Sequence, residues 1–130
     1  MLKAFLLGAA GYPLLELITR GRTHYSMAIA GGLSAAAFRY ISRSRVCLPV
    51  RMLAGGAAVT LIEGIAGCIW NRRHHVWDYR KMPLNRRGQV CLPYTFLWTA
   101  LAGLWMLIDQ PPVVQQAHAR RSEPHPSQQP

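Results

Sequence analysis

The chain has 130 residues, a length that suits one compact unit. Its Lys and Arg residues number 15 against 5 Asp and Glu, which gives a formal net charge of +10. Such a balance occurs in proteins that bind nucleic acid phosphates and in proteins that meet anionic lipid head groups. The cations occur here in short clusters between apolar runs, as in the loops of membrane proteins, and form no basic stripe on a polar domain. This distribution argues against a nucleic-acid partner.

Four apolar runs are separated by polar, mostly basic links, and they cover residues 2–19, 27–41, 52–70 and 92–108. Because roughly 20 apolar residues in a helix cross the hydrocarbon of a bilayer, each run is a candidate transmembrane helix. We expect an all-α protein, a small polytopic membrane bundle of about four transmembrane helices within residues 1–109, in the plasma or inner membrane. A soluble helical bundle is the alternative, and the second or third run could instead lie in the interface or re-enter.

Two of the runs carry further local signals. Lys3 and the apolar residues after it imitate a signal peptide, but the run continues beyond its small residues, so we expect a retained span. Pro13 beside Gly11 predicts a kink. The second run has a face of small residues that would let another helix approach closely, made of Gly31, Gly32, Ser34, Ala35 and Ala36.

Residues 110–130, the three cysteines and the missing nucleotide motif show which further features we do not expect in this protein. The segment 110–130 is rich in Pro and Gln without periodic apolar residues, which predicts a disordered polar tail. Cys47, Cys68 and Cys91 show neither paired spacing nor a neighbouring His, so we expect no disulfide framework, no metal site and no cofactor. The chain has no P-loop pattern, and any ATPase would therefore be a separate chain.

Two acidic residues lie inside the apolar runs. If all four runs cross, the link after the first run and residues 71–91, which we call the collar, lie on the same side of the membrane. Glu16 and Glu63 then both approach that side. An acidic side chain costs roughly 2.5–3.5 kcal/mol at the bilayer centre on insertion scales, so each needs a partner. Glu16 has Arg20 four residues later, whereas Glu63 has no cation at helical spacing and must face the bundle interior, another helix or the collar.

The collar combines aromatic and basic residues. Trp77 and Tyr79, with Trp70, are expected to form an aromatic belt at the membrane interface. Asp78, among arginines and a lysine, is expected to stay ionised and to hold the loop by a charge-assisted hydrogen bond. Residues 85–88 predict a turn whose glycine takes a positive φ. Lys and Arg are divided almost equally between the two sides, so the positive-inside rule predicts no orientation.

The collar and its flanks resemble the signature of the ABC-transporter type IV family, also called CmpB-like membrane proteins. That signature contains W-D-Y, P-x-N, a glycine, C-L and a later tryptophan, which stand here as Trp77, Asp78, Tyr79, Pro83, Asn85, Gly88, Cys91, Leu92 and Trp98. Gly11, Tyr12 and Glu16 resemble the family's first-helix pattern, and Glu63 resembles its acidic position in the third helix. A serine often follows W-D-Y in relatives, where this chain has Arg80. The resemblance spans roughly residues 5–108 and implies a small multi-pass membrane protein named as a permease.

These signals together define a candidate polar cluster and three hypotheses. The cluster consists of Glu16, His24, Glu63, Trp77, Asp78, Tyr79, Pro83, Asn85 and Gly88. The first hypothesis is a transport-associated subunit, which would need a homo-oligomer or a partner membrane subunit because four short helices enclose little volume. The second is a scaffold whose collar binds anionic lipid or a partner. The third, an intramembrane enzyme acting on lipid head groups with Glu63 or Glu16 as base, is the least favoured.

Overall fold

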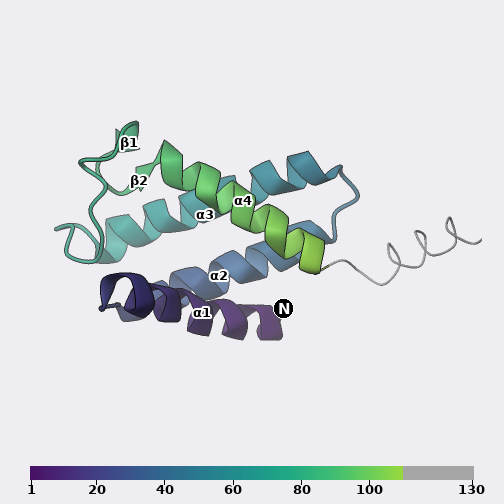
Figure 1. The fold of residues 1–130 in the computed structure, drawn as a ribbon, viewed down its shortest axis with the longest axis horizontal. Helices are drawn as coiled ribbons and strands as arrows, with labels where there is room; N and C mark the ends of the chain where they lie inside the picture. Colours follow the sequence, from purple (N-terminus) through teal and green to yellow (C-terminus); the bar gives the residue numbers. More distant parts are fainter. Residues whose placement is uncertain (110–130) are drawn as a thin grey trace, which may run out of the picture.

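A computed structural model describes residues 1–109 of the chain (Figure 1). It contains four helices: α1 (Leu2–Arg20), α2 (Tyr25–Ser42), α3 (Leu48–Trp70) and α4 (Leu92–Ile108). A short hairpin, β1 (Asn85–Arg86) and β2 (Val90–Cys91), lies in the collar between α3 and α4. The all-α prediction is confirmed for the described residues, and a helix covers each predicted apolar run. The predicted tail at 110–130 lies outside the described residues.

The helices form two layers that are joined through α2 and α3. α1 packs along α2, α4 packs along α3, and α2 also contacts α3. In Figure 1 the first pair lies below the second, and the collar closes the left-hand end of the bundle. α1 continues through Pro13 and ends at Gly21, whose φ of 68° makes a left-handed C-cap that donates its N–H to the Leu17 carbonyl. The collar therefore covers the ends of the helices where Glu16 and Glu63 lie.

Small residues set the distance between α1 and α2. A methyl group placed on Gly8 would overlap the carbonyl oxygen of Gly31, and one placed on Gly31 would overlap the carbonyl oxygen of Gly8. Two backbones this close leave no room for a β-carbon on either side. The predicted close approach on the small-residue face of the second run is confirmed, with α1 as the partner.

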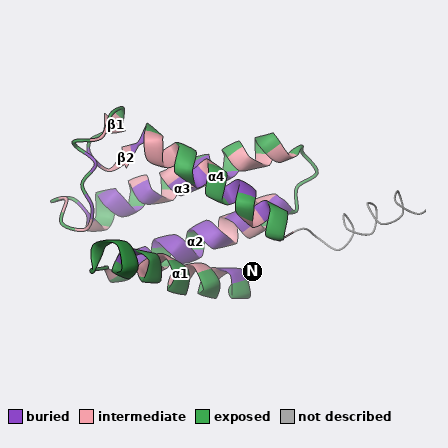
Figure 2. Cartoon of the chain, viewed as in Figure 1, coloured by how far each residue is buried: buried purple, intermediate pink, exposed green. Residues whose placement is uncertain are grey.

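The polarity of α1 and α3 is reversed relative to a helix of a soluble protein. In α1 the buried residues are Ala4 and Glu16, while Ile18 is 75% exposed. In α3 Glu63 is 4% exposed, while Leu61 is 65% exposed. Figure 2 shows the resulting exposed outer surface of α1. By length and composition α1 and α3 qualify as membrane spans and α4 is apolar but shorter, so the expected number of four spans stays a prediction.

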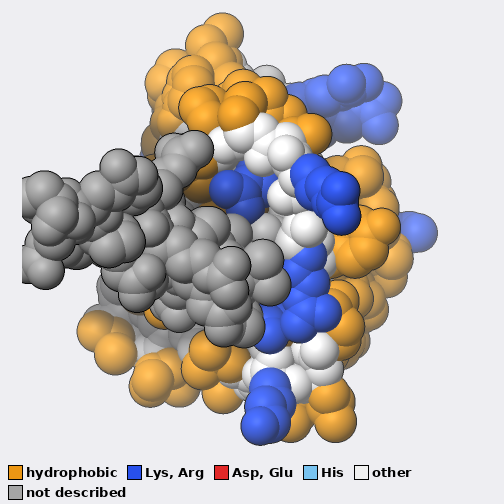
Figure 3. Space-filling model, turned by 90° about the vertical axis from the view of Figure 1, so that its right-hand side faces the viewer, with side chains coloured by type: hydrophobic (Ala, Val, Ile, Leu, Met, Phe, Trp, Pro, Cys, Tyr) orange, Lys and Arg blue, Asp and Glu red, His pale blue; other side chains and the backbone are white. Residues whose placement is uncertain are grey.

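A basic surface lies at the end of the bundle opposite the collar. Figure 3 views this end and shows Lys and Arg side chains across its middle, with hydrophobic side chains around the rim. Arg39 of α2 forms an ion pair with Asp109 after α4. Ser42 donates to the same carboxylate over 3.0 Å and its carbonyl accepts from Arg51 over 2.8 Å. These bonds tie α2, α3 and α4 together at this end.

Candidate functional site

Asn71, the first residue after α3, holds the collar together. Its side chain is fully buried, with a relative exposure of 0%. Its Nδ2 donates to the Trp77 carbonyl over 2.6 Å and to Gln89 Oε1 over 3.0 Å, and its Oδ1 accepts from the Val76 N–H over 2.9 Å. Gln89 donates back to the Asn71 carbonyl over 2.9 Å. Sequence reasoning missed this residue, since its one local signal is an amide directly after an apolar run.

Trp77 and Tyr79 are core residues. Each is 5% exposed. The Trp77 indole N–H donates to the Gln89 carbonyl over 2.9 Å, and the Tyr79 ring stacks on Tyr94 with 4.6 Å between centroids. Burial, and then the Glu63 carboxylate, raises the pKa of Tyr79, so its phenol stays protonated. The prediction that these two rings form an interfacial belt is wrong, because the collar folds back over the helix ends and covers them.

Asp78 points away from this core and pairs with Arg80. Arg80 Nη2 lies 2.7 Å from Asp78 Oδ2, and Arg80 Nε lies 2.9 Å from Oδ1. These hydrogen bonds hold the pKa of Asp78 well below its usual range, so the carboxylate stays ionised as predicted. The pair joins residues only two positions apart at an exposed site, so it shapes the local turn alone.

Asn85 and Gly88 build the hairpin. Asn85 donates to the Met82 carbonyl over 2.8 Å and accepts from the Gly88 N–H over 3.1 Å. Gly88 has a φ of 65°, which confirms the predicted positive φ, and its carbonyl accepts from the Tyr79 N–H over 3.0 Å. Pro83 is exposed and lies two residues before Asn85. These residues therefore position the collar and line no cavity that contains Glu16.

Both intrahelical carboxylates receive hydrogen bonds beneath the collar. Glu16 accepts from Arg20 over 3.1 Å and from Thr23 over 2.8 Å. Glu63 accepts from the Tyr12 hydroxyl over 3.1 Å, a bond that joins α1 to α3. Tyr12, Glu16 and Arg20 follow one another at four-residue spacing and so share one face of α1. The predicted inward orientation of Glu63 is confirmed, and its partner is a phenol from another helix.

A cavity of about 540 Å³ opens beside these groups, between α1 and α4. Its walls are mainly aromatic, and its polar groups are Glu16, Thr19 and Arg20; the aromatic members are Tyr12, Trp77, Tyr79, Tyr94 and Trp98. Glu63 does not line this cavity but accepts a hydrogen bond from Tyr12, which does. We call this cavity the carboxylate cavity. The Trp98 indole N–H is buried beside it and has no hydrogen-bond partner among the described residues.

His24 serves as the N-cap of α2. Its Nδ1 accepts from the Ser26 N–H over 3.3 Å, and its ring packs on Tyr25. It faces a smaller cavity of about 210 Å³, which Glu16 also lines. Within residues 1–109, no group of three or more His, Cys, Asp or Glu side chains could hold a metal ion.

Comparison with known proteins identifies the family. The family model described as "Putative ABC-transporter type IV" matches residues 15–125, which is most of the chain. The chain belongs to this ABC-transporter type IV family. No curated protein and no solved structure matches it.

The structure divides the candidate cluster of this family member into three parts. Glu16, Trp77 and Tyr79 line the carboxylate cavity, and Glu63 lies behind its wall, bonded to Tyr12. Asp78, Pro83, Asn85 and Gly88 belong to the collar framework, and His24 caps a helix. The sequence had placed Tyr12 in a family pattern, but its bond to Glu63, across 51 residues of chain, has no local signal.

Proposed function

We propose that this protein is a multi-pass integral membrane subunit associated with transport, permease-like, whose ATPase is a separate chain. Membership of a family described as ABC-transporter type IV supports the association with transport. The chain itself carries no P-loop. The carboxylate cavity is the site that we assign to this role.

The reversed polarity of α1 and α3 carries the proposal. In water, a bundle that buries Glu16 and Glu63 while exposing leucines and isoleucines would lose hydrophobic stabilisation and also bear the desolvation of its acids. In lipid, the exposed apolar side chains meet hydrocarbon, and intramembrane acids turn toward the bundle interior. We therefore infer that residues 1–109 form one membrane unit in the plasma or inner membrane, with all four helices crossing.

This topology predicts opposite accessibility at the two ends of the bundle. Two single-cysteine proteins are compared, one keeping only Cys47, which is exposed before α3, and one carrying only Arg73→Cys in the collar. In sealed membranes an impermeant maleimide should label one protein from outside and the other only after the membrane is opened. Labelling of both from the same side, or release of the protein by alkaline carbonate, would contradict four spans.

The transport role also predicts assembly. The Tyr12 ring of α1 meets the Trp98 ring of α4 with 5.7 Å between centroids, and four short helices enclose little volume. We expect the particle in lipid nanodiscs to contain more than one copy of the chain or a partner subunit, which a mass measurement tests. A strictly monomeric particle would instead favour the second function, a membrane scaffold that binds lipid or a partner. An enzyme acting on lipid head groups remains the least supported, since no described histidine or lysine contacts Glu63.

Glu63→Gln separates a functional carboxylate from a structural one. Glutamine keeps the acceptor for the Tyr12 hydroxyl and the side-chain volume, so we expect an unfolding temperature close to that of the wild type. Glu63→Ala, the control, leaves that hydroxyl unpaired and should lower the free energy of unfolding by about 1–3 kcal/mol. If the carboxylate acts in transport, Glu63→Gln should lose the transport activity that the wild type shows when it is assembled with its partner chains and ATPase. Equal transport activity of both proteins would exclude Glu63 from transport.

A further inference from the structure

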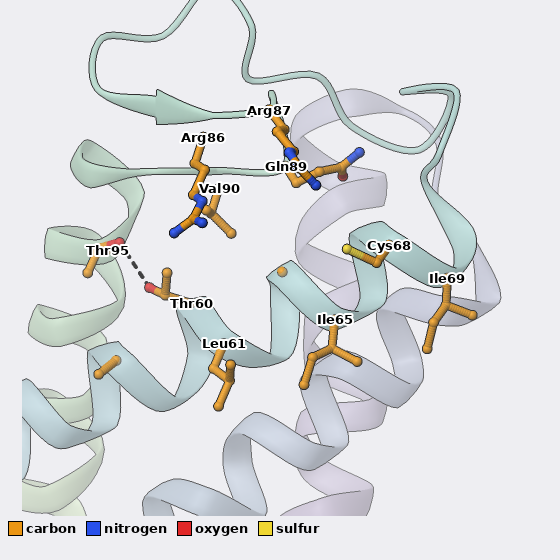
Figure 4. Close-up of a pocket in the computed structure, with 12 residues that line it drawn as sticks. Thr60, Leu61, Ile65, Cys68, Ile69, Arg86, Arg87, Gln89, Val90 and Thr95 are labelled. Atoms are coloured by element: carbon orange, nitrogen blue, oxygen red, sulfur yellow. Dashed lines mark hydrogen bonds between the residues drawn. The ribbon is translucent and has the colours of Figure 1, made fainter.

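A second cavity, of about 680 Å³, lies between α3 and the hairpin, away from the carboxylate cavity (Figure 4). Its floor is the apolar surface of α3, where Leu61, Ile65 and Ile69 are each more than half exposed. Arg86, Arg87 and Gln89 of the collar stand over it, and the paired hydroxyls of Thr60 and Thr95 lie at one end. We call this cavity the hairpin groove. No acidic residue lines it.

Three arginines near the collar have side-chain partners among the described residues, whereas Arg73 and the two arginines of the hairpin groove have none. Arg80 pairs with Asp78, Arg20 pairs with Glu16, and Arg72 donates to the Cys68 carbonyl. The guanidinium groups of Arg86 and Arg87 make no hydrogen bond or ion pair with any residue of 1–109. In Figure 4 the Arg86 side chain extends from the hairpin toward Thr60 and α3. Two cations thus stand at the mouth of an apolar groove.

A second copy of the chain has few free carboxylates that could pair with Arg86 and Arg87. Four of the five acidic residues lie in the described part of the chain. Glu16, Asp78 and Asp109 are ion-paired with Arg20, Arg80 and Arg39, and Glu63 is buried against Tyr12. Residues 1–109 therefore supply no free carboxylate for Arg86 and Arg87, and their charge is available to an anionic ligand.

We propose that the hairpin groove binds one anionic phospholipid, with its phosphate at Arg86 and Arg87 and an acyl chain along α3. Guanidinium groups bind phosphate oxygens through paired hydrogen bonds, and the exposed side chains of Leu61, Ile65 and Ile69 match a hydrocarbon chain. This inference rests on the proposed membrane location, because it places the hairpin at the level of the head groups.

The test compares dioleoylphosphatidylglycerol with dioleoylphosphatidylcholine. The full-length protein in detergent is titrated with each lipid, and bound lipid is counted by native mass spectrometry. The wild type should bind the anionic lipid about tenfold or more tightly than the zwitterionic one, since the choline ammonium offsets the phosphate charge that Arg86 and Arg87 would meet, whereas the glycerol head group leaves it net negative. The double variant Arg86→Gln, Arg87→Gly should lose this preference. Arg87 has a φ of 54°, a conformation that glycine adopts more easily, so Arg87→Gly should not destabilise the fold.

Two further proteins make the test specific. Arg73→Gln with Lys81→Gln removes the same charge from exposed collar positions outside the groove and should keep the preference. Gly64→Leu fills the groove without changing charge and should weaken binding of both lipids; Gly64 has room for a side chain, since its nearest neighbour to an added Cβ is Val90 at 3.7 Å. Equal loss of the preference in the control pair would overturn the proposal in favour of diffuse attraction to the collar. If inorganic phosphate alone displaces the bound phosphatidylglycerol, the groove is a simple anion site and the proposal is overturned.

Failure of this inference is distinguishable from failure of the proposed function. Cysteine labelling reports the topology whether or not lipid is bound. Opposite labelling of Cys47 and Arg73→Cys without any preference for phosphatidylglycerol would overturn the lipid site alone.

Discussion

Gly8→Ala is expected to lower the free energy of unfolding by about 2–3 kcal/mol and to separate α1 from α2. The added methyl group would overlap the Gly31 carbonyl oxygen and the Ala35 side chain. Because the first of these is backbone, a rotamer change cannot relieve the overlap, and the two helices must move apart. Unfolding in mixed detergent micelles, followed by circular dichroism, measures the loss.

Gly11→Ala is the matched control on the same helix. An added Cβ at Gly11 meets no atom within 4 Å. Alanine is the better helix former, so this variant should be neutral or more stable by up to about 1 kcal/mol. If Gly8→Ala and Gly11→Ala unfold alike, the helices do not approach each other at Gly8 and Gly31 as described.

Asn71→Ala is expected to lower the free energy of unfolding by about 3 kcal/mol or more and to expose the collar to protease. The substitution removes the acceptor for the Val76 N–H and the donor to Trp77 and Gln89, and the bond to the Trp77 carbonyl is buried. A buried polar group left without a hydrogen-bond partner lowers the free energy of unfolding by more than the hydrogen bond itself contributes to it. Unfolding in detergent and the rate of tryptic cleavage within 71–91 measure both effects.

His75→Ala serves as the comparison, since His75 is exposed in the same loop. An exposed side chain without hydrogen bonds should change stability by no more than about 0.5 kcal/mol. A small effect of Asn71→Ala, similar to that of His75→Ala, would mean that the collar does not depend on the buried amide.

The collar shows where local reasoning succeeds and where it fails. The charge-assisted hydrogen bond of Asp78 to Arg80 and the positive φ of Gly88 depend on neighbours within a few residues, and both predictions are confirmed. The burial of Trp77 and Tyr79 depends on contacts with Gln89 and with Tyr94 of the next helix, and the belt prediction for them was wrong. The sequence shows that a loop contains aromatic residues, but it does not show which surface of the protein those residues pack against.

The same division applies to the carboxylates. Glu16 and Arg20 lie one helical turn apart, so their pair could be predicted from spacing. The sequence showed only that Glu63 lacked such a neighbour, and its bond to Tyr12 required the packing of α1 against the rest of the bundle. The hairpin groove had no sequence signal, because its floor and its cations are about 20 residues apart.

The helices and their apolar character follow from the amino-acid sequence, because helix formation and hydropathy depend on residues close together in the chain. The direction in which each helix faces depends on the packing of the whole bundle. This packing turned Glu16 and Glu63 inward and left most leucines and isoleucines of α1 and α3 outside. The physical reason is that the exposed face of a helix is chosen by its packing partners, here through the contact of Gly8 with Gly31 and the bond of Tyr12 to Glu63.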